Sequence, residues 1–465
     1  MNDVNNLGGD LFALALNYDL PTASGASSQR NGNISEAQWK TLGDNQTNVY
    51  GYEYDYLNRL TSSVYGEITA SGYTATNQYN TGYTYDPRGN ILTLNRVGMV
   101  GAYGSLQSSP IDDLDYTYAP GSNRLLQVTD AITGPTENIP QDVIVDQPIN
   151  DNQVVEASNS IIATSTVDGS REVSFRAGNE ITLNPDFEIT AVGNGDFEVV
   201  VDESISSGTV QAGFIERSDV DYAYDANGNL TSSLDKGITH IEYNYLNLPN
   251  LIQKGDNVRI LFSYTADGLK LQSSREEWQG SAWVTVESRF YLPGLEINND
   301  DIEALYHVDG RIVKTNGAAV QPSSFQFQYT LKDHLGNTRV LFKTEDNSTP
   351  PITSDIIQQN HYYPFGMELN GDWGAVQPQP DHRYRFNGIE HSEEVGLDLA
   401  PFRNYDAAIG RWLHVDPMAE SMSAWSPYNF SFANPIAYMD PLGLSPYTYN
   451  WDTGQYEDED GNVAD

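Results

Sequence analysis

The apolar and polar positions of the chain alternate in short runs that are bounded by turn residues. A unit of the form Tyr-x-Tyr-Asp-x-x-Gly/Asn-Asn/Arg-Leu recurs along the sequence. The alternation places two tyrosine rings on one face of a strand, while the Asp and the Gly or Asn supply a tight turn. Each unit is therefore predicted to be a β-hairpin. Its copies are YEYDYLNRL from Tyr52, YTYDPRGNI from Tyr83, YTYAPGSNRL from Tyr116 and YAYDANGNL from Tyr222, with weaker copies that begin at Tyr243, Phe262 and Tyr329.

The repetition of this unit predicts an all-β fold. A single hairpin is marginally stable in water, so successive units are expected to stack into one long continuous sheet. The composition agrees with this expectation, because 30 tyrosines, 39 glycines and 22 prolines favour short strands and many turns over long helices.

The spacing of the units predicts an insertion. Tyr83 follows Tyr52 by 31 residues and Tyr116 follows Tyr83 by 33, whereas Tyr222 follows Tyr116 by 106. Between residues 134 and 213 the tyrosines disappear, and an apolar alternation is interrupted by Gly, Asn and Asp, which indicates a small β module. This segment is similar to the β-stack modules of secreted bacterial surface proteins.

The sequence accordingly divides into five parts. They are a Tyr-Asp repeat sheet over residues 1–133, the inserted module over 134–213, a continuation of the repeat sheet over 214–320, an aromatic-rich segment without a fixed period over 321–444, and a polar, acidic end over 445–465. The last part is expected to form one hairpin around Asp452-Thr453-Gly454.

The charge excludes one class of partner. The chain has 24 Lys and Arg residues against 64 Asp and Glu, a formal net charge of -40, so it cannot assemble a basic surface for nucleic acid. It has no cysteine, and its histidines lack metal-ligand spacing, so neither a metal site nor a cofactor is predicted. The opening residues, MNDVNNLGGDLFALALNYDL, contain neither a signal peptide nor a membrane span.

The motifs after residue 321 carry a resemblance to a known family. In chain order they are DHLGNTR, YYPFG, YRFNGIE, NYDAAIGRW, HVDP, SPYN and DPLG. Together with the Tyr-Asp units they resemble the RHS/YD-repeat family and its repeat-associated core segment. The resemblance implies a wound sheet of β-hairpins that forms a hollow or partial shell, with the core segment as a plug at one end.

The resemblance also implies a function and a location. Proteins of this kind are polymorphic toxins of bacterial competition, in which the shell encapsulates and delivers a variable C-terminal effector. The implied partners of this chain are its own C-terminal effector region and a secretion machinery or cell-surface partner. The implied location is secreted or at the cell surface, as part of a longer chain.

Self-cleaving members of the family cut at the junction between core and effector and use one arginine and two aspartates. Matched by motif, the arginine is Arg403 in FRNYD, and the aspartates are Asp416 in HVDP and Asp440 in MDPLGL. The resemblance implies a cut between Leu444 and Ser445.

The residue types at this predicted site suit acid–base chemistry. Two carboxylates in a poorly solvated site can share a proton. One would then deprotonate or orient a water, and the other would protonate the carbonyl oxygen or the leaving amide. An arginine would either keep one carboxylate ionised or stabilise the developing oxyanion, and Arg411 in GRW is the alternative to Arg403. The competing interpretation is that each Asp-Pro pair only begins a turn, with its side chain capping the next amides.

Two other functions stay open for the whole protein. One is an extracellular adhesion or glycan-binding scaffold that encloses no cargo, with recognition carried by the β module and the tyrosine rows. The other is a protease that acts only on itself.

Overall fold

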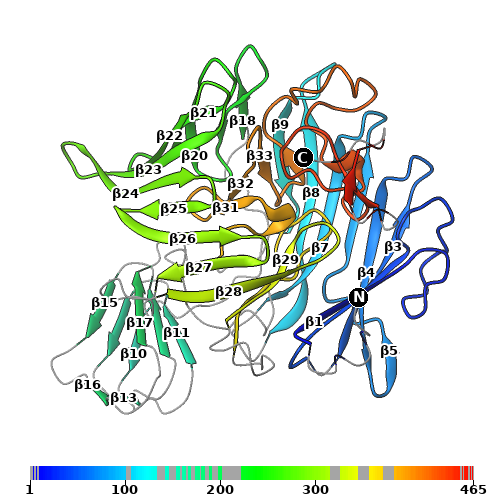
Figure 1. The fold of residues 1–465 in the computed structure, drawn as a ribbon, viewed down its shortest axis with the longest axis horizontal. Helices are drawn as coiled ribbons and strands as arrows, with labels where there is room; N and C mark the ends of the chain where they lie inside the picture. The colour runs from blue at the N-terminus through cyan, green and yellow to red at the C-terminus, as the bar shows by residue number, and fades with distance from the viewer. Residues whose placement is uncertain are drawn as a thin grey trace. The chain divides into compact units, whose positions relative to one another are not determined.

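The computed structural model describes residues 10–44, 46–100, 106–132, 221–314, 325–343, 355–369 and 382–450, together with eight strands between 142 and 201 and a few positions near both ends. The chain consists of two compact units. The first comprises residues 1–98, 112–131 and 214–465, and the second comprises 99–111 and 132–213. The predicted all-β class is confirmed, since the regular structure is almost entirely β-strand (Figure 1).

The first large sheet follows the chain from one strand to the next. It has nine strands in the order β1-β2-β3-β4-β6-β7-β8-β9, with β5 paired to β4 alone. The strands are β1 (Phe12–Asn17), β2 (Glu36–Thr41), β3 (Thr47–Tyr54), β4 (Leu60–Thr69), β5 (Gly72–Thr74), β6 (Thr81–Tyr85), β7 (Ile91–Val100), β8 (Gln107–Tyr118) and β9 (Leu125–Asp130).

The second large sheet continues the same pattern after the insertion. Its thirteen strands pair in sequence order and run antiparallel from β18 to β30. They are β18 (Tyr222–Tyr224), β19 (Leu230–Ser233), β20 (Ile238–Tyr243), β21 (Pro249–Lys254), β22 (Val258–Tyr264), β23 (Lys270–Trp278), β24 (Trp283–Leu292), β25 (Leu295–Asn298), β26 (Asp301–His307), β27 (Gly310–Lys314), β28 (Phe325–Lys332), β29 (Thr338–Lys343) and β30 (Ile356–Gln359). The sheet thus extends past residue 320, where the sequence suggested a change.

The expectation of one continuous sheet is wrong, because the insertion divides it. The chain leaves after β9 and returns at β18, and these two strands belong to different sheets. They still meet where Asp221 N donates to Leu126 O at 3.1 Å. At the other ends of the two sheets, Leu11 packs with Val340 and Ile356 in an apolar cluster. The two sheets of this unit are therefore in contact at both ends.

Each repeat unit folds as the predicted hairpin. In the first unit, Asp55 Oδ1 accepts the amides of Leu57 and Arg59 at 2.9 and 3.0 Å, and Asn58 takes the left-handed conformation with φ 63°. The first tyrosine of the unit, Tyr52, is buried. The side chain of Asp thus replaces backbone partners in the turn, which is why this residue type recurs there.

In the units that begin at Tyr83, Tyr116 and Phe262, the tyrosine at the third position ties the unit to the previous one. Tyr85 Oη donates to Leu60 O at 2.6 Å, and Tyr118 Oη donates to Ile91 O at 2.7 Å. The same bond recurs in the second sheet between Tyr264 and Pro249 O at 2.8 Å. In these three units the acceptor is the residue that starts the return strand, so the bond fixes the spacing between the neighbouring hairpins.

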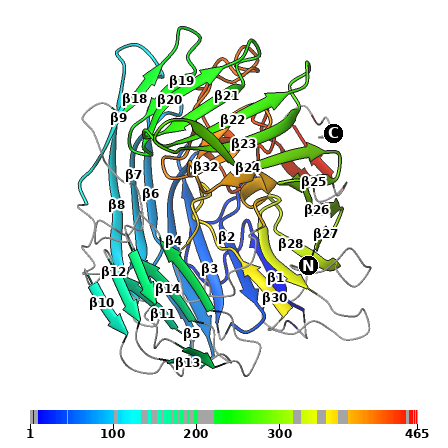
Figure 2. The ribbon, with the colours of Figure 1, turned by 90° about the vertical axis from the view of Figure 1, so that its left-hand side faces the viewer.

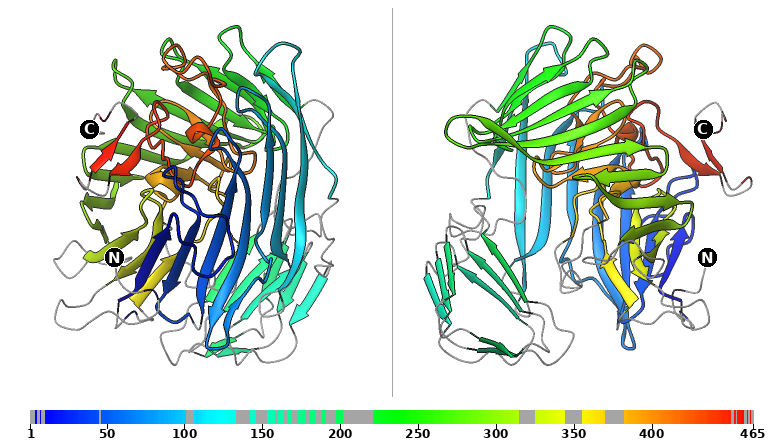
Figure 3. Two further views of the ribbon diagram at one scale, coloured as in Figure 1. Left: turned by 90° about the vertical axis from the view of Figure 1, so that its right-hand side faces the viewer. Right: turned by 60° about the vertical axis from the view of Figure 1, so that its left-hand side comes forward.

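The part of the aromatic-rich segment from residue 382 on is called the C-terminal segment below. It packs against both large sheets, as the orange ribbon shows in Figures 2 and 3. It holds a small sheet of β31 (Glu390–Ser392), β32 (Leu397–Leu399), β33 (Asn404–Asp406) and β34 (Arg411–Trp412), and two short 3-10 helices, η5 (Phe386–Gly388) and η6 (Ser431–Ala433). Tyr116 Oη from the first sheet donates to Ile409 O at 3.0 Å. Tyr428 Oη donates to Gly228 O at 2.7 Å in the second sheet.

The second compact unit, which holds the insertion, contains parallel strands. They are β10 (Asp142–Val145), β11 (Gln153–Ala157), β12 (Ser160–Ala163), β13 (Thr166–Asp168), β14 (Val173–Ala177), β15 (Glu180–Leu183), β16 (Glu188–Thr190) and β17 (Phe197–Val201). They form three parallel stacks, β10-β12-β15, β11-β14-β17 and β13-β16. Consecutive strands along the chain therefore belong to different stacks, and this order repeats, as in the predicted β-stack module.

The polar end of the chain forms the predicted hairpin. Its strands are β35 (Thr448–Asn450) and β36 (Gln455–Glu457), which pair antiparallel. In the part of the chain that the structure describes, no helix is long and apolar enough to cross a membrane.

Candidate functional site

The predicted arginine and aspartates come from three places in the C-terminal segment. Arg403 directly precedes β33, Asp416 lies in a turn after β34, and Asp440 begins a turn beyond η6. All three are buried, with 1%, 6% and 0% of their surfaces exposed. Charged side chains are rarely buried to this extent unless they are paired, so their partners decide what the site can do.

The two carboxylates meet at one nitrogen of the arginine. Arg403 Nη2 lies 2.9 Å from Asp416 Oδ2 and 2.9 Å from Asp440 Oδ2. The structure therefore brings together the three residues that the motifs indicated, although 37 residues separate Arg403 from Asp440.

Several contacts hold the guanidinium in place. Its carbon lies 4.4 Å from the centre of the Trp412 ring, a cation–π distance. Nε donates to Gly443 O at 2.8 Å and Nη1 donates to Pro427 O at 3.3 Å. These contacts leave the Nη2 group for the two carboxylates and for Leu444 O.

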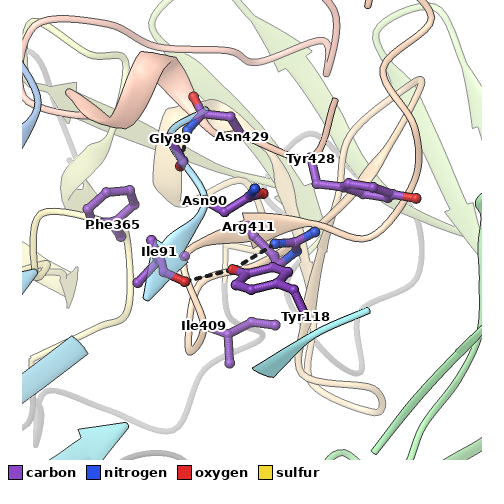
Figure 4. A pocket seen from close by; sticks show the side chains of 10 residues that line it. Gly89, Asn90, Ile91, Tyr118, Phe365, Ile409, Arg411, Tyr428 and Asn429 are labelled. Atoms are coloured by element: carbon purple, nitrogen blue, oxygen red, sulfur yellow. Dashed lines mark hydrogen bonds between the residues drawn. The ribbon is translucent and has the colours of Figure 1, made fainter. Parts of the chain in front are cut away.

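The alternative arginine belongs to another site. Arg411 Nη1 donates to Tyr118 Oη at 3.1 Å, and Nη2 donates to Asn123 O at 2.7 Å. Figure 4 shows Arg411 beside Tyr118, whose hydroxyl in turn donates to Ile91 O. Arg411 thus ties the C-terminal segment to the first sheet.

The predicted junction lies against the same arginine. Asp440 Oδ1 accepts the amides of Gly443 and Leu444, each at 2.9 Å, and Arg403 Nη2 lies 3.4 Å from Leu444 O. The following residue, Ser445, is inside a loop that Met439 and Tyr447 close with two backbone hydrogen bonds of 2.8 and 2.7 Å. The Leu444–Ser445 bond is therefore held on both sides.

Burial shifts the protonation of these groups. It raises the pKa of Asp416 to about 6, and the nearby Arg403 charge opposes this rise. Burial also raises the pKa of Asp440 and lowers that of Arg403, in each case against the attraction of its partner. A carboxylate with a pKa near 6 exchanges its proton readily close to neutral pH, as a general base or acid must.

A small cavity adjoins the site. It has a volume of about 10 Å³, close to the space that one water needs, and its lining includes Arg403, Asp416, Pro427 and Pro446. Pro446 is the second residue after the junction, so this cavity connects one carboxylate with the chain just beyond the predicted cut.

Sequence reasoning missed the residues that position Arg403. Trp412 carries it on its ring face, and Gly443 allows its close approach, because a Cβ at Gly443 would lie 3.0 Å from Arg403 Cβ. Gly443 also has a φ of +75°. The glycine in DPLG and the tryptophan in GRW were the available signals, but a turn glycine and a core aromatic are common without any site.

Within the described ranges, no group of three His, Asp or Glu side chains is placed to hold a metal ion. The ring of His334 lies against backbone, with Nε2 2.9 Å from Ile436 O.

Comparison with known proteins gives relatives for parts of the chain, while no family model matches it. Toxin subunit YenC2 of Yersinia entomophaga is 25% identical over 268 residues, which are 54% of this chain and 27% of the relative. Salivary gland surface protein 1 of Aedes aegypti is 29% identical over 118 residues, 25% of this chain and 3% of the relative. The chain spans less than a third of the length of either relative.

A solved structure shares the fold. The structure of TcdB2-TccC3-Cdc42 matches with a TM-score of 0.50 at 16% sequence identity, over 94% of this chain and 18% of that chain. Nearly the whole chain thus corresponds to a fraction of a much longer β-protein.

Proposed function

We propose that this chain is part of an RHS-type β-shell that encapsulates and delivers a C-terminal effector, and that it cuts itself once between Leu444 and Ser445. The observation that carries the proposal is the arrangement at Arg403 Nη2, which lies 2.9 Å from each of two buried carboxylates and 3.4 Å from Leu444 O. If Arg403 needed only charge balance, one carboxylate would be enough. A contact with the carbonyl oxygen of Leu444 would then have no purpose.

The proposed reaction is hydrolysis of one peptide bond. Asp416 takes a proton from a water, whose oxygen bonds to the carbonyl carbon of Leu444. Arg403 stabilises the negative charge that develops on Leu444 O. The proton then passes to the nitrogen of Ser445 and the C–N bond breaks, which leaves a carboxylate on Leu444 and an amine on Ser445.

Asp440 has a different role in this proposal. Its Oδ1 binds the amides of Gly443 and Leu444, and its Oδ2 binds Arg403. It therefore fixes the junction carbonyl relative to the guanidinium, and such fixed geometry contributes several orders of magnitude in rate.

The shell part of the proposal is supported by the repeat. The two sheets of the first unit contact each other at both ends, and the C-terminal segment binds both sheets. Similarity to toxin subunit YenC2 over half of the chain supports a toxin-associated role.

Mass spectrometry of the purified protein tests the cut. We expect one fragment that ends at Leu444 and a second that comprises the last 21 residues, with both absent from Asp416→Asn and Asp440→Asn. Asp86→Asn is the matched control, because Asp86 is also followed by proline and caps a turn, but that turn joins β6 and β7 of the first sheet. An intact wild-type chain after prolonged incubation between pH 5 and pH 8 would sink the cutting proposal.

Encapsulation is tested separately with a protease-sensitive passenger fused after Asp465. Protection of the passenger from an added protease is expected in the folded fusion and should disappear when the fusion is unfolded in urea. Digestion at the rate of the free passenger would contradict encapsulation.

An adhesion scaffold is the second candidate, and similarity to salivary gland surface protein 1 is the observation that favours it. Binding to a glycan array that disappears when residues 134–213 are deleted would support this candidate over encapsulation.

A further inference from the structure

The turns of neighbouring repeat units are connected through asparagine side chains. Asn90 Nδ2 donates to Asn123 Oδ1 at 2.8 Å in the first sheet. In the second sheet, Asn229 Nδ2 donates to Asn247 Oδ1 at 2.9 Å. Each donor also binds the aspartate of its own turn, as Asn229 does with Asp225 Oδ2 at 3.0 Å. The asparagines therefore transmit the position of one turn to the next.

At the turn between β28 and β29 the partner comes from the C-terminal segment. Asn337 binds its own aspartate as in the repeats, with Nδ2 2.9 Å from Asp333 Oδ2. Its Oδ1 accepts the backbone amide of Asn387 at 2.7 Å and the side-chain Nδ2 of Asn387 at 3.2 Å. Asn387 thus pairs with the turn asparagine as the next turn's asparagine does in the repeats, but with the roles reversed, because here Asn387 donates and Asn337 accepts.

Asn387 passes the connection on to the predicted site. Its Oδ1 accepts the backbone amide of Asp440 at 2.9 Å. Asn337, Asn387 and Asp440 are buried, with 3%, 2% and 0% of their surfaces exposed. An unbroken series of buried hydrogen bonds therefore leads from the sheet to the backbone of the junction aspartate.

The surroundings of Asn387 make it a rigid support. Its φ of 51° lies in the left-handed region, which asparagine tolerates better than most residues. The preceding residues are bound to β29, because Thr338 N donates to Arg385 O at 3.0 Å and Thr338 Oγ1 donates to Tyr384 O at 2.8 Å. The side chain of Asn387 can therefore hold Asp440 only when this segment is docked on the sheet.

We propose that Asn387 is a positioning residue for Asp440 and that it makes cutting depend on docking of the 384–388 segment against the turn at residues 333–337. This inference rests on the proposed function for its effect on cutting. A chain whose turn at residues 333–337 is not yet formed lacks the support for Asp440 and keeps its Leu444–Ser445 bond. The cut would then follow completion of this end of the sheet.

The first test compares single-turnover cutting in two glycine variants. Asn387→Gly removes the side-chain acceptor while glycine still accepts the positive φ. Asn247→Gly is the matched control, because Asn247 has a φ of 58° and accepts a bond from Asn229 but lies in a repeat turn. We expect N387G to cut about 10- to 100-fold more slowly than wild type, in line with the cost of a misplaced catalytic group, and N247G to cut at the wild-type rate.

A conservative variant separates positioning from a general loss of structure. Asn387→Asp keeps an acceptor for the Asp440 amide but adds a charge close to that carboxylate. We expect N387D to cut faster than N387G and to shift the acid limb of the pH–rate profile to higher pH, because a neighbouring negative charge raises the pKa of a carboxyl group. Equal slowing of N387G, N387D and N247G would overturn the inference.

A readout that needs no cutting distinguishes this inference from the proposed function. In Asp416→Asn protein, amide hydrogen exchange at Asp440 should be at least about 10-fold faster when N387G is added, because the acceptor of that amide is lost. Unchanged protection of the Asp440 amide would overturn the positioning role even if the wild-type chain cuts. A wild-type chain that never cuts, with the expected exchange result, would refute the proposed function alone.

Discussion

The sequence contains three Asp-Pro pairs, at Asp86, Asp416 and Asp440, and a comparison of their turns separates structure from chemistry. In each turn, Oδ1 of the aspartate accepts backbone amides. Asp86 binds the amide of Arg88 at 2.8 Å, Asp416 binds that of Met418 at 2.7 Å, and Asp440 binds that of Leu444 at 2.9 Å. Asp-Pro therefore forms the same kind of capped turn in the repeat and at the junction.

The three turns differ in the partner of the second carboxylate oxygen. Asp86 Oδ2 accepts Nδ2 of Asn90 at 2.8 Å, a neutral amide of the same turn. Oδ2 of Asp416 and Oδ2 of Asp440 both face the buried Arg403. The turn interpretation and the site interpretation are therefore compatible, because they use different oxygens of the same side chain.

The largest expected effect is that of removing the shared cation. Arg403→Met leaves two buried carboxylates without a cationic partner, which should lower the free energy of unfolding by about 3–5 kcal/mol at pH 7. Arg88→Met, in the Asp86 turn, removes an exposed arginine and should change the free energy of unfolding by less than about 0.5 kcal/mol. Urea unfolding of both variants provides the measurement. A loss below about 1 kcal/mol for R403M would mean that the carboxylates do not depend on the arginine.

The next effect concerns the glycine against which Arg403 packs. Gly443 has a φ of +75°, and its Cβ would lie 3.0 Å from Arg403 Cβ, whereas Gly121 has a φ of +68° and nothing within 4 Å. Gly121→Ala should cost about 1 kcal/mol, because an L-residue is strained in the left-handed region. Gly443→Ala should cost a further 1–3 kcal/mol, roughly the price of overpacking. Thermal unfolding measures both, and equal losses would show that the site is not crowded.

Local chemistry explains which parts of this fold could be predicted from sequence. The turn at Asp55 depends on residues within four positions of it, so the motif sufficed to predict the hairpin. The contact between Arg403 and Asp440 joins residues 37 positions apart, and only the order of motifs in a resembling family indicated it. The support from Asn387 had no signal of its own, because a buried asparagine in a turn has many structural uses.

The same limit applies to the sheets. Alternation predicted strands in the second unit, but parallel and antiparallel strands alternate alike, so their parallel pairing could not be predicted. The division of the large sheet between β9 and β18 depends on where the chain returns after the insertion, which no local pattern records.

A smaller effect should appear in the pH dependence of stability. Asp416 has a pKa of about 6 in the folded protein against an ordinary value of 3.8, so between pH 4 and pH 6 the folded chain binds this proton more tightly than the unfolded chain. Stability therefore falls as pH rises through this window, by about 2–3 kcal/mol from this group. Asp416→Asn should remove that part of the fall in urea unfolding measured from pH 4 to pH 7. Parallel curves for the wild type and D416N would contradict a raised pKa.

The smallest expected effect comes from a tyrosine hydrogen bond that anchors the repeat turn at Asp86. The residue before Asp86 is Tyr85, whose hydroxyl binds Leu60 O of the preceding unit, whereas Val415 and Met439 stand before the other two aspartates. Tyr85→Phe should lower the free energy of unfolding by about 1 kcal/mol, the net value of one hydrogen bond, and should leave the cutting rate unchanged. The repeat turn loses one of several anchors, since Asp86 keeps its bonds to Arg88 and Asn90. Slower cutting in Y85F would contradict this expectation. It would mean that loss of a hydrogen bond in the repeat alters the geometry at Arg403, so that the two kinds of Asp-Pro turn are not independent.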